Sequence, residues 1–170
     1  DLFICEFNVT DYTNTDIYIR NMLLIFSIIV KYQAFGGTCI IKIDNIFYKA
    51  IVDILFALSA LYDKVYLVKP IISSITKSER YLICKKFQPG LIDYTSLLCQ
   101  IQDKIVKRII NQSFDNQHIA SMIQNEIPSY FLNRLEESNA VIGQQQLEAY
   151  DQIINIFKNK NKEDKLETLK

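Results

Sequence analysis

Three charged side chains stand where a folded chain could bring them together for acid–base chemistry. Glu6 ends a short apolar run, Lys42 interrupts the strand-like run that begins at Thr38, and Glu79 precedes a further apolar run. A lysine accepts a proton from a hydroxyl group only when burial or a second positive charge disfavours its ammonium form, and flanking carboxylates oppose that shift. A lysine that extends to solvent beside two solvated glutamates is the simpler alternative, and the spacing alone leaves both open.

The composition indicates a compact chain without a dominant charge. It has 170 residues, of which 49% are hydrophobic, with 19 basic and 19 acidic side chains. This length suffices for one domain with a buried core, or for part of a larger one. Because the charges balance, net charge does not indicate a nucleic-acid partner or an acidic substrate, and any such partner has to bind a local patch.

The cysteines predict an intracellular protein. Cys5, Cys39, Cys84 and Cys99 are widely spaced, and each lies in an apolar context. We therefore expect buried, reduced thiols rather than disulfides. With His118 as the single histidine, we predict no metal site.

The sequence predicts no membrane-spanning segment. The densest apolar stretch, 22–30, is shorter than the ~20 residues that a membrane-spanning helix needs, so we expect no membrane segment. The chain opens in a strand-like run at Asp1 rather than with methionine. We interpret it as a piece of a longer protein.

The first half of the chain predicts an α/β fold. Strands are expected at 2–7, 38–43, 65–68 and 80–85, with helices at 16–34, capped by Thr15 and stopped by Gly36 and Gly37, and at 47–61. This alternation favours βαβ units in a mainly parallel sheet. Only about ten residues separate the last two strands, so we predict that they pair antiparallel as a hairpin at the sheet edge.

After Gly90 the pattern becomes helical. We expect helices at 92–111, 116–126 and 129–157, the last one weakened near Gly143. Apolar residues recur at helical spacing in the last helix and predict one buried stripe. The stripe consists of Leu147, Tyr150, Ile154 and Phe157. Residues 1–90 would then form the α/β part and 91–170 a helical carboxyl-terminal extension.

Four segments resemble the second half of FtsJ-like (RrmJ-type) 2'-O-ribose methyltransferases, and in particular the cap methyltransferase domains of large nucleocytoplasmic DNA viruses. The segments that carry the resemblance are "DLFICEF", "GGTCIIKIDNIF", "DKVYLVKPIISSITKSERYLICKKF" and "YFLNRLEESNAVIGQQQLEAYDQIINIFKNKNKEDK". The resemblance implies the carboxyl-terminal half of a Rossmann-like methyltransferase sheet, with parallel strands plus an antiparallel hairpin strand. It also implies S-adenosyl-L-methionine as cofactor and RNA, the capped 5' end of mRNA, as partner.

The family uses a Lys-Asp-Lys-Glu tetrad, and three of its positions fall in this chain. Lys42 matches the second lysine in the "GGxxxxK" pattern, and Glu79 matches the glutamate of "KPxxSRxxSSExY". Glu6 stands where the family has aspartate, one methylene shorter, and would lie beside the methyl donor. The first lysine and the glycine-rich cofactor loop would lie upstream of Asp1.

The same "KP" segment supplies candidate RNA contacts. Lys69, Ser73 and Ser78 match the family pattern, whereas Ser74 replaces its arginine and Lys77 stands where serine is frequent. Apart from the resemblance, a lysine before a proline is often merely exposed, and serines in a hairpin loop often bond the loop itself.

These observations lead to one functional hypothesis and one alternative. The hypothesis is an S-adenosylmethionine-dependent RNA 2'-O-ribose methyltransferase acting on the mRNA cap. Lys42 would be the general base, and Glu79 would orient it and the ribose. The alternative is a catalytically silent scaffold or RNA-binding subunit of a viral capping or virion assembly. Other capping-complex or virion proteins would be partners, and the location would be the host cytoplasm or the virion.

Overall fold

The computed structural model describes residues 1–7, 14–71, 73–89, 119–123 and 126–167, with side chains up to residue 159. The chain forms two compact units. The first consists of Asp1–Pro70 and Glu79–Pro128, and the second of Ile71–Ser78 and Ser129–Lys170. The described elements are β1 (Leu2–Cys5), α2 (Thr15–Tyr32), β2 (Thr38–Ile43), α3 (Lys49–Leu61), β3 (Tyr62–Val68), β4 (Arg80–Phe87) and α6 (Ser129–Glu167).

The four strands of the first unit form one mixed sheet in the order β1-β2-β4-β3. β1 pairs parallel with β2, whereas β4 pairs antiparallel with both of its neighbours. The predicted antiparallel pairing of the last two strands is confirmed. The expectation of a mainly parallel sheet is wrong for the pairings, because β4 inserts between β2 and β3. β3 nevertheless runs in the same direction as β1 and β2, because it pairs antiparallel with β4, and β4 in turn pairs antiparallel with β2.

The two faces of the sheet differ in burial, and this explains a lysine within a strand. Along β2, Cys39, Ile41 and Ile43 are fully buried, whereas Ile40 and Lys42 are half-buried. Side chains alternate between faces along a strand, so Lys42 belongs to the less covered face. We call this the Lys42 face. The strand is thus amphipathic, and Lys42 does not interrupt a buried run.

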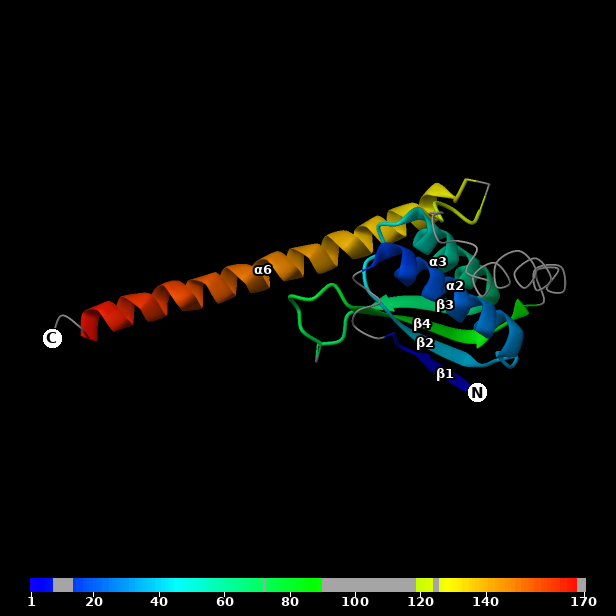
Figure 1. The fold of residues 1–170 in the computed structure, drawn as a ribbon, viewed down its shortest axis with the longest axis horizontal. Coiled ribbons are helices and arrows are strands. Elements are labelled where there is room, and N and C mark those ends of the chain that lie inside the picture. Colours follow the sequence, from blue (N-terminus) through cyan, green and yellow to red (C-terminus); the bar gives the residue numbers. More distant parts are fainter. Residues whose placement is uncertain (8–13, 72, 90–118, 124–125, 168–170) are drawn as a thin grey trace. The chain divides into compact units, whose positions relative to one another are not determined.

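Two helices cover the opposite face. α2 ends earlier than expected, and α3 begins later than expected. α2 and α3 lie side by side on the sheet in Figure 1. The cap of α2 is Asn14, whose side chain accepts from the N–H groups of Asp16 and Ile17, so the prediction of Thr15 is wrong. Thr15 instead opens the helix, and its hydroxyl donates to that of Tyr48.

The turn between α2 and β2 requires glycine. α2 ends at Tyr32, before the predicted end at residue 34. Gly36 has a φ of +72°, in the left-handed region that favours glycine, and its N–H donates to the Phe87 carbonyl. The turn thereby joins the amino end of β2 to the carboxyl end of β4.

Three strand boundaries differ from the predicted ones. β1 stops at Cys5 rather than at residue 7, and its apolar Leu2 and Ile4 are 55% and 71% exposed. The reason is that β1 is an edge of the sheet among the described strands. β3 begins at Tyr62, directly after α3, and β4 continues to the buried Phe87.

The predicted helix at 116–126 is wrong where it is described. Residues 119–123 and 126 are not helical, because Asp53 on α3 binds this stretch. The Asp53 carboxylate accepts from the N–H groups of Met122 and Ile123 and from the Ser121 hydroxyl. These donors are therefore not available to helical hydrogen bonds. The helix predicted at 92–111, together with Cys99 and His118, lies outside the described residues.

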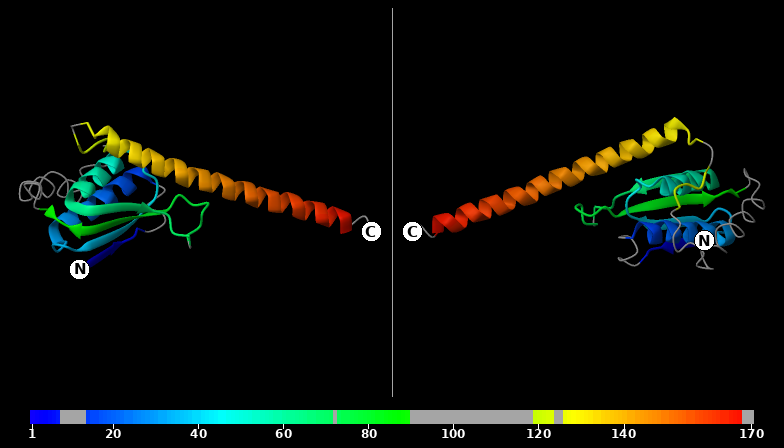
Figure 2. Two further views of the ribbon diagram at one scale, coloured as in Figure 1. Left: turned by 180° about the vertical axis from the view of Figure 1, so that it is seen from behind. Right: turned by 45° about the horizontal axis from the view of Figure 1, so that its top comes forward.

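In the second unit, α6 is one continuous helix through Gly143, in both views of Figure 2. The weak point predicted at this glycine is therefore wrong. A Cβ at Gly143 would meet nothing within 4 Å, so alanine fits at this position sterically. The predicted buried stripe is also wrong. Leu147, Tyr150, Ile154 and Phe157 are between 46% and 64% exposed.

Candidate active site

Strand register brings the three predicted site residues together. β1 and β2 pair with Cys5 beside Ile41, so the next step along both strands places Glu6 beside Lys42. On the other side of β2, Lys42 pairs with Tyr81 of β4. Glu79 precedes Tyr81 by two residues and therefore falls on the same face. All three meet on the Lys42 face, where β1 and β2 end and β4 begins.

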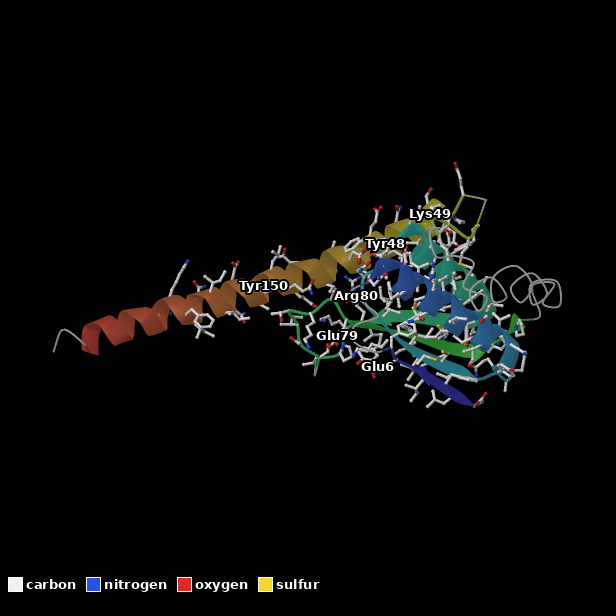
Figure 3. The ribbon with its side chains drawn as sticks, viewed as in Figure 1. Glu6, Tyr48, Lys49, Glu79, Arg80 and Tyr150 are labelled. Atoms are coloured by element: carbon white, nitrogen blue, oxygen red, sulfur yellow. The ribbon has the colours of Figure 1, made fainter. Side chains whose placement is uncertain are left out.

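Lys42 forms an ion pair with each of the two glutamates. The Lys42 Nζ donates to the Glu6 Oε1 over 2.6 Å and lies 3.4 Å from the Glu79 Oε2. The Lys42 and Glu79 side chains are 18% and 22% exposed, whereas the Glu6 side chain is 60% exposed. Figure 3 shows Glu6 and Glu79 near one another at this end of the strands. Glu6 therefore has accessible surface for a ligand.

The carboxylates decide the charge of Lys42. The hydrogen bond to Glu6 is the main influence that raises its pKa above the ordinary lysine value. Burial acts in the opposite direction, and Glu79 adds to the increase. Lys42 is therefore an ammonium at neutral pH in this arrangement. Only a neutral amine can accept a proton, and the contact with Glu6 opposes that form.

Lys69 contacts the backbone of a site residue. Its Nζ donates to the Glu79 carbonyl over 2.9 Å, and the side chain is half-buried. Burial lowers the pKa of Lys69, and the charge of Glu79 partly opposes this. The structure thus brings Lys69 to Glu79, one of the three predicted catalytic residues.

The two predicted serines belong to the second unit. Ser73 and Ser78 lie in the loop Ile71–Ser78, where Ser73 is half-buried and Ser78 is exposed. The loop contains one turn, in which the Lys77 N–H donates to the Ser74 carbonyl. Ser78 is adjacent in sequence to Glu79, which directly precedes β4.

Sequence reasoning missed the residues that fix the end of β2. The buried Tyr18 of α2 accepts from the Asp44 N–H and donates to the Asn45 carbonyl through its hydroxyl. Arg80 is also buried. Burial lowers the pKa of Arg80, and the charge of Asp44 opposes that shift. A tyrosine in an apolar helix and an arginine at a strand start carry no sequence signal for this role.

An exposed aromatic residue follows the same strand. Phe47 is 74% exposed in the loop between β2 and α3, where a helix start had been predicted. Exposed aromatic rings are suited to stacking on nucleobases. The only signal in the sequence is an aromatic residue within the polar stretch "IDNIFY".

The described residues include no group of three histidine, cysteine or acidic side chains placed to hold a metal ion. Cys5, Cys39 and Cys84 are free thiols. Cys39 and Cys84 are buried, and burial raises the pKa of Cys84 to about 12. In the part of the chain that the structure describes, no helix is long and apolar enough to cross a membrane.

Three curated proteins are similar to this chain. The cap-specific mRNA (nucleoside-2'-O-)-methyltransferase 2 of Mus musculus is 25% identical over 122 residues, which cover 72% of this chain and 15% of that protein. The cap-specific mRNA (nucleoside-2'-O-)-methyltransferase 1 of Leishmania braziliensis is 25% identical over 160 residues, covering 90% of this chain and 37% of that protein. The cap-specific mRNA (nucleoside-2'-O-)-methyltransferase 2 of Pongo abelii is also 25% identical, over 137 residues.

The similarity covers most of this chain but a minor part of each relative. The chain spans between 15% and 37% of the length of these proteins. No family model matches the chain. All three relatives are named as methyltransferases of the mRNA cap.

Proposed function

We propose that this chain is part of an S-adenosylmethionine-dependent methyltransferase that modifies a ribose 2'-hydroxyl of RNA, at the mRNA cap. The observation that carries the proposal is the placement of Lys42 between Glu6 and Glu79, within a chain similar to cap 2'-O-methyltransferases. Open α/β sheets bind ligands beyond the carboxyl ends of their strands, where Glu6 and Lys42 lie.

The sheet supports this assignment. β1, β2 and β3 run in one direction, and β4 runs in the opposite direction between β2 and β3. A Rossmann-like methyltransferase half with parallel strands and one antiparallel hairpin strand, as the resemblance implies, has this arrangement. Among the described residues, the helices α2 and α3 cover one face, and the three charged side chains lie on the other, the Lys42 face.

The proposed reaction needs a group that takes a proton. When S-adenosylmethionine is bound, its sulfonium supplies the electrophilic methyl group that a ribose oxygen attacks. As the oxygen–carbon bond forms, the methyl–sulfur bond of the donor would break and S-adenosylhomocysteine would leave as a neutral thioether. A neutral Lys42 amine would accept the hydroxyl proton. Glu79, 3.4 Å from the amine nitrogen, would hold Lys42 and the ribose hydroxyl in line. DNA lacks this hydroxyl, which would make RNA the substrate.

The residues of this chain fit one side of such a cofactor. Glu6 presents an exposed carboxylate that could face a cationic sulfonium, and it reaches Lys42 despite the additional methylene relative to aspartate. Gly36 and Gly37 cannot form the glycine-rich cradle for the same cofactor, because they lie at the amino end of β2. The four glycines of the chain are residues 36, 37, 90 and 143.

A second candidate function is a catalytically silent scaffold or RNA-binding subunit of a capping or virion assembly. The raised pKa of Lys42 favours it, because an ammonium held by Glu6 cannot act as a base. In this case the three charged residues would only stabilise the ends of the strands. The two functions differ in whether methyl transfer depends on Lys42.

Methyl transfer from labelled S-adenosylmethionine to capped RNA by the full-length protein tests the proposal. We expect Lys42→Ala to lower kcat at least about 100-fold, the usual size of a general-base contribution. Lys64→Ala, an exposed lysine on β3, serves as the matched control and should retain activity. RNA with a 2'-deoxy target nucleotide should not be methylated.

Equal activity of wild type and Lys42→Ala would remove Lys42 from the mechanism. RNA binding without any transfer by the wild type would favour the scaffold.

A further inference from the structure

Tyr18 lies behind the candidate active site, on the helix-covered face of the sheet. It belongs to α2 and is fully buried. Glu6, Lys42 and Glu79 lie on the Lys42 face, so the residue that follows each of them points toward the helices. These following residues are Phe7, Ile43 and Arg80. Contacts on the helix side can therefore determine where the three charged groups stand.

The ring of Tyr18 contacts the residue next to Glu6. It meets the Phe7 ring edge to face, with 6.4 Å between the ring centroids and 86° between the ring planes. The pairing of β1 with β2 ends at Cys5 and Ile41, so Glu6 and Phe7 follow the last pair of the two strands. The aromatic contact thus contributes to the position of this part of the chain.

The hydroxyl of the same tyrosine binds the chain that follows Lys42. It accepts from the Asp44 N–H over 3.2 Å and donates to the Asn45 carbonyl over 3.2 Å. The single proton of the hydroxyl and one of its lone pairs are thus both used, on consecutive residues. The hydroxyl thereby fixes the point at which the chain leaves β2, two residues after Lys42.

Arg80 connects the same tyrosine to the third charged residue. It is 4% exposed, pairs with Ile43 of β2 and directly follows Glu79. Burial lowers the pKa of Arg80, and electrostatic interactions with Asp44 and with Tyr18 oppose this shift. Tyr18 therefore interacts with a residue close in sequence to each of the three charged groups, and all of these residues belong to the sheet unit.

We infer that Tyr18 is a positioning residue that holds Glu6 and Lys42 in place relative to one another, its ring acting through Phe7 and its hydroxyl through the chain after β2. The Lys42 Nζ lies 2.6 Å from the Glu6 Oε1, and such a contact weakens when either chain segment moves. Without the hydroxyl, the ring and Phe7 are no longer tied to the end of β2. The contact with Glu6 then loosens, and the pKa of Lys42 falls.

The titratable groups around the Lys42 ammonium come from every neighbouring strand. Glu6 follows β1, Glu79 precedes β4, and Tyr81 of β4 pairs with Lys42. Lys69 follows β3 and donates to the Glu79 carbonyl. Among these groups Glu6 is the largest cause of the raised pKa of Lys42. A change that moves Glu6 should therefore lower this pKa more than a comparable change at Glu79.

Competitive labelling of the full-length protein with a trace of acetic anhydride tests the inference without reference to activity. Only the neutral amine of a lysine is acylated, so the labelling of Lys42 reports how firmly its ammonium is held, and the exposed Lys64 is the internal reference. At pH 9 we expect Tyr18→Phe to raise the ratio of Lys42 to Lys64 labelling at least about fivefold, the factor that one lost hydrogen bond represents. Peptide mass spectrometry measures this ratio. Phe7→Leu, which removes the ring contact and keeps the hydroxyl, should also raise it.

Tyr62→Phe is the matched control. Tyr62 is 5% exposed, and its hydroxyl donates to the Gln33 Oε1 before the amino end of β2, at the other end of the strand from Lys42. This variant loses a buried tyrosine hydroxyl in the same unit and should leave the labelling ratio unchanged. An unchanged ratio in Tyr18→Phe overturns the inference, and so does an equal increase in the control. An effect of Tyr18→Phe without an effect of Phe7→Leu overturns the link to Glu6.

The consequence for catalysis rests on the function proposed above. In methyl transfer to capped RNA, Tyr18→Phe should move the rise of kcat/KM to lower pH, as a lower pKa of Lys42 requires, and Tyr62→Phe should match the wild type. Increased labelling of Lys42 with an unchanged pH profile would overturn the role of Tyr18 in catalysis. If the wild type transfers no methyl group, the proposed function fails, but the labelling ratios still decide whether Tyr18 positions Glu6 and Lys42.

Discussion

At the scale of single residues, the site is defined by competition between burial and two carboxylates. Lys42 is only 18% exposed, and burial alone would lower its pKa. The 2.6 Å hydrogen bond to Glu6 outweighs this effect and keeps the ammonium. Glu6 is therefore the largest single cause of the raised pKa of Lys42, and any event that neutralises or moves Glu6 lowers that pKa.

Replacing Glu6 with glutamine should shift the pH dependence of methyl transfer. The substitution removes the charge and the main cause of the raised pKa of Lys42, so this pKa falls. Because the neutral amine is the active form of a base, the rise of kcat/KM with pH should move to lower pH. The measurement is a pH–rate profile from pH 6 to 10. Glu79→Gln should shift the rise less, since Glu79 is a smaller cause. A profile of Glu6→Gln that coincides with the wild type would contradict this account.

Phe47 offers a test of base stacking near the site. Its ring is 74% exposed in the loop that follows β2 at the carboxyl end of the strand. Stacking on a base contributes ~1–3 kcal/mol, so Phe47→Ala should raise the KM for capped RNA between about 5- and 150-fold. Phe35→Ala is the control, because Phe35 is 80% exposed but precedes the amino end of β2. Steady-state kinetics with capped RNA provide the measurement, and equal effects of both substitutions would argue against a specific contact.

At the scale of elements, Asp53 connects α3 to residues far along the chain. It is fully buried and accepts from Lys49 Nζ, from the Ser121 hydroxyl and from two backbone N–H groups. Burial by itself would raise the pKa of Asp53, but these donors together hold it below the ordinary value. A carboxylate with four donors thus fixes residues 121–123 against the helix.

Asp53→Asn should destabilise the sheet unit by about 2–3 kcal/mol, because the amide turns N–H groups toward donors and leaves buried partners unsatisfied. The lowered pKa adds a pH dependence. The stabilisation is complete above the unfolded pKa of about 3.9 and is lost as the pH falls through the lower folded value. Urea unfolding at pH 7 and pH 3 measures both effects. Asp63→Asn, which removes an exposed ion pair with Lys86, should change stability far less. A comparable loss in that control would contradict the mechanism.

The sequence pattern predicts correctly those elements whose ends are fixed by neighbouring residues. The strand Thr38–Ile43 was predicted with both boundaries, because a left-handed glycine precedes it and polar residues follow. The helix at 116–126 was predicted wrongly because its N–H groups are bound by Asp53, roughly seventy residues earlier in the sequence. The start of α3 was misplaced because Phe47 extends the apolar period although its ring is exposed. No local pattern contains such distant partners or distinguishes exposed from buried aromatic rings.

The site was predictable in part for the same reason. Strand ends place Glu6, Lys42 and Glu79 at one edge once the strands are identified, and the register follows from alternating burial. The direction of the Lys42 pKa was not predictable, because it depends on distances of 2.6 and 3.4 Å in the folded chain. The contact of Lys69 with the Glu79 backbone was missed because it depends on how the hairpin closes.

At the scale of the whole molecule, the two units are stabilised in different ways. The sheet unit has a core of fully buried side chains from β2, β4, α2 and α3. Residues 151–159 of α6, in contrast, are all exposed, so this part of the helix depends on local propensity rather than packing. Residues near Gln146 and Tyr150 lie between these extremes, because their side chains bind the β3–β4 loop. The free energy of local opening should therefore decrease along α6 beyond Tyr150.

Hydrogen–deuterium exchange of the full-length protein measures this gradient directly. We expect amides of β2 and β4 to exchange only on global opening of the sheet unit, and amides of residues 151–159 to exchange at least about 100-fold faster. The double variant Gln146→Ala/Tyr150→Phe, which loses both hydrogen bonds to the β3–β4 loop, should speed exchange around residues 146–150 and leave β2 unchanged. Equal protection of 151–159 and β2 would mean that a further surface covers the exposed Ile153, Ile156 and Phe157. Dilution would then identify that surface, because a second copy of the chain dissociates at low concentration whereas a segment of the same chain does not.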